Sequence, residues 1–241
     1  MGDDTPTQFI LVCLPYAGGT ANSYIPLSKL LRGRLSIAAV EFPGHGRRRM
    51  EVARTSSLQL AREICEAIGQ SISGPFAILG HSLGAVLAFE TARFLRENSD
   101  RRPVRLFLSG RRAPHLTVPL RGIREMNDAA FEDMLRAFGG TPDEILCNPG
   151  LMRLLAPALR ADFEMSESYV YQAGEPLGCP ISVFGGLSDL EVTAEGLAEW
   201  ARHTTSTCTQ RMLPGNHFFI HSAASVIAQH VLSDLAADGA V

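Results

Sequence analysis

The stretch Gly-His-Ser-Leu-Gly at 80–84 constrains the fold of this chain more than any other part of the sequence. An apolar run, 76–79, leads into it, and an apolar stretch with helix-forming residues, 85–89, follows it. This order predicts a strand, a sharp turn and a helix, with Ser82 at the tip of the turn. The two glycines lack a Cβ, so the strand and the helix can pass close beside each other. The start of the helix directs backbone N–H groups toward Ser82, which makes this serine a candidate nucleophile beside a place suited to an anion.

The rest of the chain alternates apolar runs typical of buried strands with helical patterns. The expected strands lie at 9–14, 35–40, 76–80, 104–109, 180–186 and 208–213. Helices are expected from Asn22 or Ser23 to about 31, over 57–71, from the serine turn to about 97, after Thr193, and near the end through 226–231. The alternation predicts an α/β fold with a mostly parallel sheet wound by helices through right-handed crossovers.

The alternation stops between about 114 and 178, where no strand is evident. Helical patterns cover about 127–138 and 149–170, and we expect Pro157 to interrupt the second one. Four of the seven methionines and several aromatic residues fall in this segment, which favours a pliable apolar surface. We predict one domain over 1–241 with a helical insertion at about 114–178 that forms a lid over the site; packing as an ordinary helical subdomain is the alternative. The predicted substrate pocket contains Met134, Phe138 and Phe163.

A serine hydroxyl is a poor nucleophile at neutral pH, so it needs a base and a group that orients the base. For a serine on such a turn, the acid and then the histidine follow later strands. His217 comes after the last expected strand and Asp189 after the one before it. They are the predicted base and acid, with Glu191 and Asp162 as alternative acids.

The other histidines fit the role of the base less well. His81 adjoins the serine and is expected to point away from its hydroxyl, and His45 and His115 precede the acid. His203 lies between a helix and a strand, while His221 and His230 fall in or near the closing helix.

An acyl-transfer serine also requires donors for the oxyanion of its tetrahedral intermediate. One expected donor is the backbone N–H of Leu83, directly after the nucleophile. The other is expected from the loop after the first strand, where we favour Ala17 over its neighbour Tyr16. The glycines at 18 and 19 allow the tight turn that this arrangement needs.

Composition excludes several other classes of protein. The net charge is −3, with a single lysine, Lys29, and no basic stripe interleaved with aromatic residues, so no nucleic-acid partner is expected. No apolar run reaches the length of a membrane helix, and no secretory signal is evident at the start. The five cysteines are scattered, which favours free thiols and a cytoplasmic location. No Cys/His cluster has metal-ligand spacing, so neither a metal nor another cofactor is expected.

Five stretches together resemble the type II thioesterases of nonribosomal peptide and polyketide synthesis. They are Leu-Pro-Tyr-Ala-Gly-Gly at 14–19, Pro-Gly-His-Gly-Arg at 43–47, the serine motif at 80–84, Ser-Gly-Arg-Arg-Ala-Pro at 109–114, and Gly-Asn-His-Phe-Phe at 215–219. The resemblance covers nearly the whole chain. Leu83 and Asn216 depart from the residues common in this family, methionine and glycine, and both departures concern packing or loop stiffness.

The resemblance implies an α/β-hydrolase fold with a helical lid. It also implies hydrolysis of acyl groups from the phosphopantetheine arms of acyl or peptidyl carrier proteins, with the phosphopantetheine as part of the substrate. Carrier proteins of this kind are typically acidic near the arm, so the arginines at 47–49, 111 and 112 are candidate docking residues. The alternatives are a general carboxylesterase or an acyltransferase of the same fold, and a carrier-binding protein without catalysis.

Overall fold

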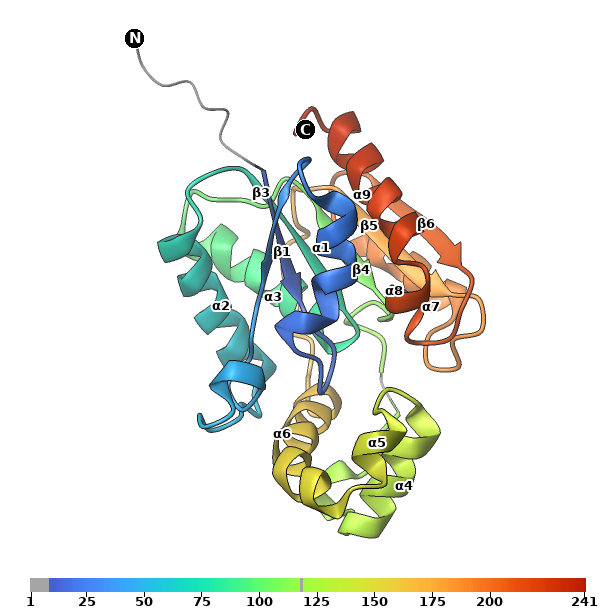
Figure 1. Cartoon of the computed structure of the whole chain (residues 1–241). Coiled ribbons are helices and arrows are strands. Elements are labelled where there is room, and N and C mark those ends of the chain that lie inside the picture. Colours follow the sequence, from blue (N-terminus) through green and yellow to red (C-terminus); the bar gives the residue numbers. More distant parts are fainter. Residues whose placement is uncertain (1–8, 118) are drawn as a thin grey trace.

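Six parallel strands form the central sheet, in the order β2–β1–β3–β4–β5–β6 (Figure 1). The strands are β1 (Ile10–Leu14), β2 (Ser36–Ala39), β3 (Phe76–His81), β4 (Leu106–Ser109), β5 (Ile181–Gly186) and β6 (Cys208–Leu213). β1 pairs with both β2 and β3, so the chain runs from β1 to the edge strand β2 and then continues on the other side of β1, from β3 to β6. The computed structural model describes residues 9–117 and 119–241.

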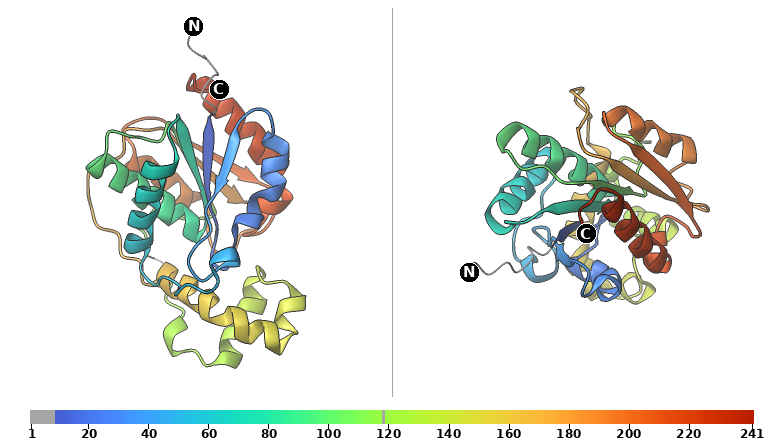
Figure 2. Two further views of the ribbon diagram at one scale, coloured as in Figure 1. Left: turned by 60° about the vertical axis from the view of Figure 1, so that its left-hand side comes forward. Right: turned by 90° about the horizontal axis from the view of Figure 1, so that it is seen from above.

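Helices cover both faces of the sheet (Figure 2). The α-helices are α1 (Ile25–Leu31), α2 (Ser57–Ser71), α3 (Leu83–Asn98), α4 (Asp128–Phe138), α5 (Asp143–Leu146), α6 (Pro149–Glu167), α7 (Ala194–Ala198), α8 (Phe219–Ser222) and α9 (Ala224–Ala237). Short 3-10 helices lie at Ala21–Tyr24, Gly46–Arg48, Ile123–Glu125 and Glu199–His203. One apolar cluster packs α2, α3 and α7 against the sheet, and a second packs α1, α8 and α9 against its other face. The parallel α/β fold predicted from the alternation of elements is confirmed.

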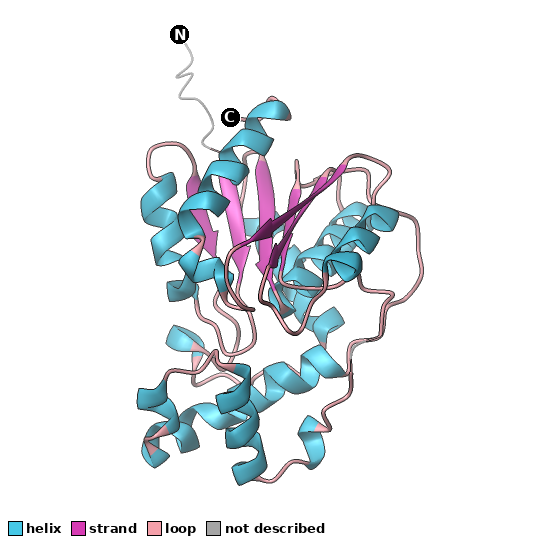
Figure 3. Cartoon of the chain, turned by 90° about the vertical axis from the view of Figure 1, so that its right-hand side faces the viewer, coloured by secondary structure: helices cyan, strands magenta, loops and turns pink. Residues whose placement is uncertain are grey.

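A separate helical layer lies beyond the carboxyl ends of the strands (Figure 3). It consists of α4, α5, α6 and the 3-10 helix Ile123–Glu125, and it falls within the segment where the strand pattern stops. The layer has its own apolar cluster, with Phe131, Leu135 and Met152 at its centre. Its position places it over the end of the sheet where α/β proteins bind ligands. Its function as a lid stays a prediction.

Two local predictions were wrong. Pro157 does not interrupt α6, because its ring is exposed to solvent and only one backbone hydrogen bond is lost, while Ala158 and Leu159 beside it are buried. The first helical segment begins after Thr20, whose reciprocal hydrogen bonds with Ser23 form a capping box.

The structure addresses two predictions made from composition, those of free thiols and of no membrane helix. All five cysteines are free thiols, and Cys13 is buried in β1. Within residues 9–117 and 119–241, none of the helices combines the length and the apolar character that crossing a membrane requires.

Candidate active site

Ser82 stands on the turn between β3 and α3 in a conformation that L-residues rarely adopt. Its φ is 53° and its ψ is −113°, and no other non-glycine residue in the described part of the chain has a positive φ. The two flanking glycines are required by close packing. A Cβ on Gly80 would clash with the backbone of Gly84, and a Cβ on Gly84 would clash with the carbonyl oxygen of Leu14. The strained turn therefore exposes the serine hydroxyl at the carboxyl edge of the sheet.

The structure brings Ser82, His217 and Asp189 together, although the serine and the histidine are 135 residues apart in sequence. Nε2 of His217 lies 3.0 Å from Oγ of Ser82, and Nδ1 lies 2.9 Å from Oδ2 of Asp189. Because the carboxylate can only accept, Nδ1 carries the proton and Nε2 is free to accept from the serine hydroxyl. The three residues follow β3, β6 and β5, whose ends meet at the same edge of the sheet.

The loop after β5 holds the Asp189 carboxylate in a fixed orientation. Its side chain is 0% exposed, and its Oδ1 accepts a hydrogen bond of 2.8 Å from the N–H of Glu191. Both oxygens therefore have assigned partners. The two alternative acids lie elsewhere: Glu191 pairs with Arg121, and Asp162 lies on α6, where it contacts Gly18 and His45.

Two of the other histidines support the site without reaching the serine hydroxyl. His81 is fully buried, and its Nδ1 lies 2.9 Å from Oγ of Ser109. Burial, followed by the nearby His217, holds the pKa of His81 well below its usual value, so this ring is neutral. His221 contacts the hydroxyl of Tyr16 at 2.9 Å through its Nε2. Neither contact gives these rings the position of a base.

The predicted oxyanion donors lie at the ends of adjacent strands. Leu83 is the first residue of α3, so its N–H has no carbonyl partner within the helix. Ala17 lies in the loop after β1 (residues 15–19, the β1 loop), and its N–H makes no hydrogen bond to another described residue. β1 and β3 are paired, with Leu14 opposite Gly80. Both N–H groups are thus available next to the serine turn, and their role in catalysis stays a prediction.

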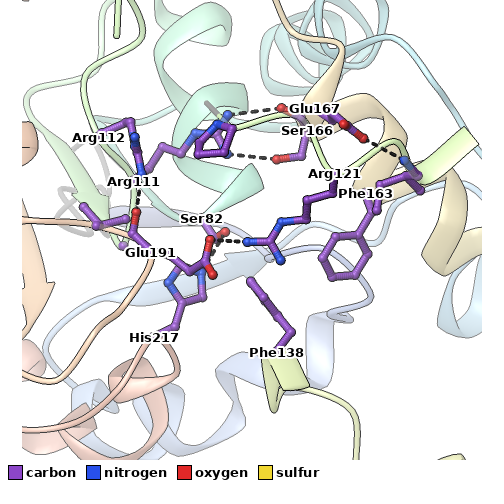
Figure 4. Close-up of a pocket in the computed structure, with 14 residues that line it drawn as sticks. Ser82, Arg111, Arg112, Arg121, Phe138, Phe163, Ser166, Glu167, Glu191 and His217 are labelled. Atoms are coloured by element: carbon purple, nitrogen blue, oxygen red, sulfur yellow. Dashed lines mark hydrogen bonds and ion pairs between the residues drawn. The ribbon is translucent and has the colours of Figure 1, made fainter. Parts of the chain in front are cut away.

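A cavity of about 60 Å³ adjoins Ser82 and His217 (Figure 4). Phe138 and Phe163 line it, as expected, whereas Met134 packs in the apolar cluster of the helical layer. The cavity also has charged walls that sequence reasoning missed. Arg121 pairs with Glu191 and lies over the ring of Phe138, 5.3 Å from its centroid. No motif surrounds Arg121, so only the fold reveals its position.

A second cavity, of about 410 Å³, adjoins the β1 loop. Ala17 and Gly18 form one wall, and Leu155 and Leu159 of α6 form the opposite, apolar wall. The two cavities share no lining residue, and of the two only the smaller one reaches Ser82.

The candidate docking arginines differ in exposure: Arg47 and Arg49 are exposed, Arg48 and Arg112 are half-buried, and Arg111 is buried. Arg111 is buried and donates to Oγ of Ser166 at 2.9 Å and to its carbonyl oxygen at 3.2 Å, at the C-terminal end of α6. Burial, followed by the charge of Arg112, lowers the pKa of Arg111 to about 10. Arg111 therefore anchors α6 and is unavailable to a partner, while Arg47 and Arg49 are exposed. The described residues contain no group of three or more His, Cys, Asp or Glu side chains arranged to hold a metal ion.

The chain is similar in sequence to known proteins over most of its length. The sequence profile of the thioesterase family, described as "Thioesterase domain", matches residues 9–237. Thioesterase PikA5 of Streptomyces venezuelae is 37% identical over 227 residues, which cover 92% of this chain and 80% of that protein. "Linear gramicidin dehydrogenase LgrE" of Brevibacillus parabrevis is 39% identical over 218 residues, 89% of this chain and 83% of that protein.

A solved structure is similar over almost the whole chain. The RedJ thioesterase from the prodiginine biosynthetic pathway in Streptomyces coelicolor has a TM-score of 0.86 and 34% identity, and the match covers 95% of this chain and 86% of that one.

Proposed function

This chain belongs to the thioesterase family, and we propose that it is a stand-alone serine thioesterase that hydrolyses acyl groups from the phosphopantetheine arms of carrier proteins. The observation that carries the proposal is the chain of contacts from Asp189 through His217 to Ser82, at 2.9 and 3.0 Å. The resemblance to thioesterases of peptide and polyketide synthesis supplies the class of substrate. A cytoplasmic location, acyl or peptidyl carrier partners and the absence of a required cofactor are part of the proposal.

The first half of the reaction forms an acyl-enzyme. Nε2 of His217 takes the proton of the Ser82 hydroxyl as Oγ attacks the thioester carbonyl. The N–H groups of Leu83 and Ala17 stabilise the oxyanion, and the dipole of α3 adds to this stabilisation. The C–S bond then breaks, and the protonated His217 returns its proton to the departing pantetheine sulfur.

The second half hydrolyses the acyl-enzyme. His217 takes a proton from a water molecule, whose oxygen attacks the ester carbonyl in the same oxyanion site. Collapse of the intermediate releases the carboxylic acid and returns the proton to Oγ of Ser82. Asp189 keeps the proton of the neutral imidazole on Nδ1 and stabilises the imidazolium in both steps.

The alternative functions differ from this proposal in the cofactor, the substrate or the acyl acceptor. One similar protein is named a dehydrogenase, yet this chain contains no Gly-x-Gly-x-x-Gly dinucleotide motif. A general carboxylesterase would hydrolyse simple oxoesters as well as thioesters. An acyltransferase would pass the acyl group to an alcohol or amine rather than to water, and a carrier-binding protein would form no acyl-enzyme.

The test is hydrolysis of a panel of acyl-loaded carrier proteins, followed by intact mass. We expect the wild-type enzyme to remove acyl groups and to prefer thioesters over matched oxoesters. Ser82→Ala should bind the loaded carrier without turnover, and Ser71→Ala, at an exposed serine on α2, serves as the matched control.

Three results would reject the proposal. They are equal turnover of oxoesters and thioesters, transfer of the acyl group to an added amine in preference to water, and failure of a fluorophosphonate to label Ser82 in the folded protein.

A further inference from the structure

Asp162 of α6 contacts two loops of the sheet at a point close to the serine turn. Its Oδ2 accepts a hydrogen bond of 2.7 Å from the N–H of Gly18, in the β1 loop. The same oxygen lies 2.9 Å from Nε2 of His45, which belongs to the Pro-Gly-His-Gly-Arg motif. The side chains of Asp162 and His45 are 2% and 5% exposed, so the contact is shielded from water. The reaction steps described above use neither residue.

The neighbours of His45 favour the protonated form of its ring. Its Nδ1 lies 3.2 Å from the carbonyl oxygen of Pro43, which can only accept, and its Nε2 faces the Asp162 carboxylate. These two neighbours favour the protonated ring, in which His45 and Asp162 form an ion pair; the contact is a close approach of charges, because Nε2 does not have the geometry of a hydrogen bond to the carboxylate. Burial lowers the pKa of His45, but Asp162, the carbonyl of Pro43 and the charge of Glu41 together raise it by more, so its pKa lies above the usual value.

The contact bears directly on the position of the predicted oxyanion donor. Gly18 immediately follows Ala17 and has a φ of 76°, and a Cβ at this position would clash with Leu159 of α6. The β1 loop is thus packed against α6 and hydrogen-bonded to it through Asp162. A shift of α6 relative to the sheet would act on the Gly18 peptide, which directly follows the peptide that bears the Ala17 N–H.

We propose that Asp162 and His45 are positioning residues that hold the β1 loop against α6, so that the oxyanion site is complete only when the helical layer is docked on the sheet. His45 compensates the buried charge of Asp162, and Asp162 fixes the Gly18 peptide. This inference rests on the proposed function, since it requires an oxyanion beside Ala17. It assigns a role to Gly18, the first glycine of the β1 loop, and to the histidine of the 43–47 motif.

The test compares Asp162→Ala and Asp162→Asn with the wild-type enzyme. A small acyl-thioester gives kcat and KM, and a trifluoromethyl ketone analogue, which binds as an oxyanion adduct of the serine, gives an inhibition constant. Glu164→Gln is the matched control, because Glu164 lies on the same helix and pairs with the exposed Arg124.

We expect Asp162→Ala to lower kcat by about 10- to 100-fold, since loss of a whole oxyanion donor costs about 100- to 1,000-fold. KM should change far less, and the inhibition constant should rise in parallel with the loss of kcat. Asp162→Asn should recover part of the loss, because its amide oxygen can still accept from Gly18, and Glu164→Gln should match the wild type.

A folded Asp162→Ala that keeps the wild-type kcat and inhibition constant overturns the inference, and so does a fall in kcat without weaker inhibitor binding. If Asp162→Ala is unfolded at the assay temperature, Asp162→Asn decides by the same two measurements. Failure of the proposed function is distinguishable, because it would appear as a wild-type enzyme that leaves acyl-carriers intact while its turnover of the small thioester still depends on Asp162.

Discussion

Replacing Asp189 with asparagine tests whether this residue is the acid that orients His217. In the native site, Oδ1 accepts from the N–H of Glu191 at 2.8 Å and Oδ2 faces Nδ1 of His217 at 2.9 Å. Asparagine has only one oxygen, and the Glu191 N–H requires an acceptor. The amide NH₂ is then directed at Nδ1 of His217, which must become an acceptor, so the proton moves to Nε2. An Nε2–H facing Ser82 cannot take the serine proton.

The size of the effect follows from this choice of tautomer. The reverse orientation of the amide would leave the Glu191 N–H facing an NH₂ group, at a cost of about 1–3 kcal/mol for an unsatisfied buried group. The inactive tautomer is therefore favoured. The same substitution in a serine protease triad lowers kcat by about 10⁴, and we expect Asp189→Asn to lower kcat/KM by about 10³–10⁴, or about 4–5.5 kcal/mol of transition-state stabilisation.

The assay is hydrolysis of a small acyl-thioester under conditions where fold and melting temperature are checked for each variant. Glu195→Gln, an exposed acid in the first turn of α7, is the control and should leave the rate unchanged. Full activity in Asp189→Asn together with collapse in Asp162→Asn would refute the reasoning and transfer the role of the acid to Asp162. A modest loss in Asp162→Asn beside a large loss in Asp189→Asn is the expected pattern.

Four further predictions concern other parts of the molecule. Gly84→Ala should lower the free energy of unfolding by about 3 kcal/mol and abolish activity, because the new Cβ clashes with the carbonyl of Leu14. Denaturant titration measures the loss, and a variant as stable as the wild type would contradict this prediction. Phe163→Ala enlarges the cavity beside Ser82 and should shift preference toward longer acyl chains in a competition assay; unchanged preference would make its role purely structural. Arg49→Ala should lower kcat/KM for an acyl-carrier but not for a small thioester, with the difference shrinking as salt rises, and equal loss on both substrates would contradict docking. The pKa of His45 is raised, so its ion pair with Asp162 is complete below the usual histidine pKa and is lost as pH rises through the raised value. A plot of kcat against pH should therefore fall on the alkaline side in the wild type and not in His45→Gln.

The order and type of most elements could be predicted from the sequence, because buried parallel strands and amphipathic helices have distinct periodicities. β5 and β6 begin and end within a residue of their expected bounds. The prediction at Pro157 relied on the rule that proline breaks a helix. In the structure the ring is exposed and the neighbouring apolar residues are buried, so packing maintains the helix. Local sequence does not encode which side of a helix will face solvent when its partners come from elsewhere in the chain.

The contacts of Ser82, Asp189 and His217 were predictable because each follows a strand, and a parallel sheet brings all strand ends to one edge. The contact between Asp162 and Gly18 was not, because it spans 144 residues and depends on how the helical layer is oriented on the sheet. The pairing of Arg121 with Glu191 depends on the same orientation. The sequence identified the fold, the three residues Ser82, Asp189 and His217, and the cavity residues Phe138 and Phe163, whereas the charged part of the cavity wall required the tertiary structure.

The placement of the site residues along the chain has a consequence for biosynthesis of the protein itself. Ser82 lies early in the sequence, but His217 follows β6, an edge strand that pairs only with β5. During translation, more than half of the chain is therefore synthesised after Ser82 and before His217, the base that the serine needs. Domains fold largely as units during synthesis, so the nascent protein stays chemically inert until its last strand has joined the sheet.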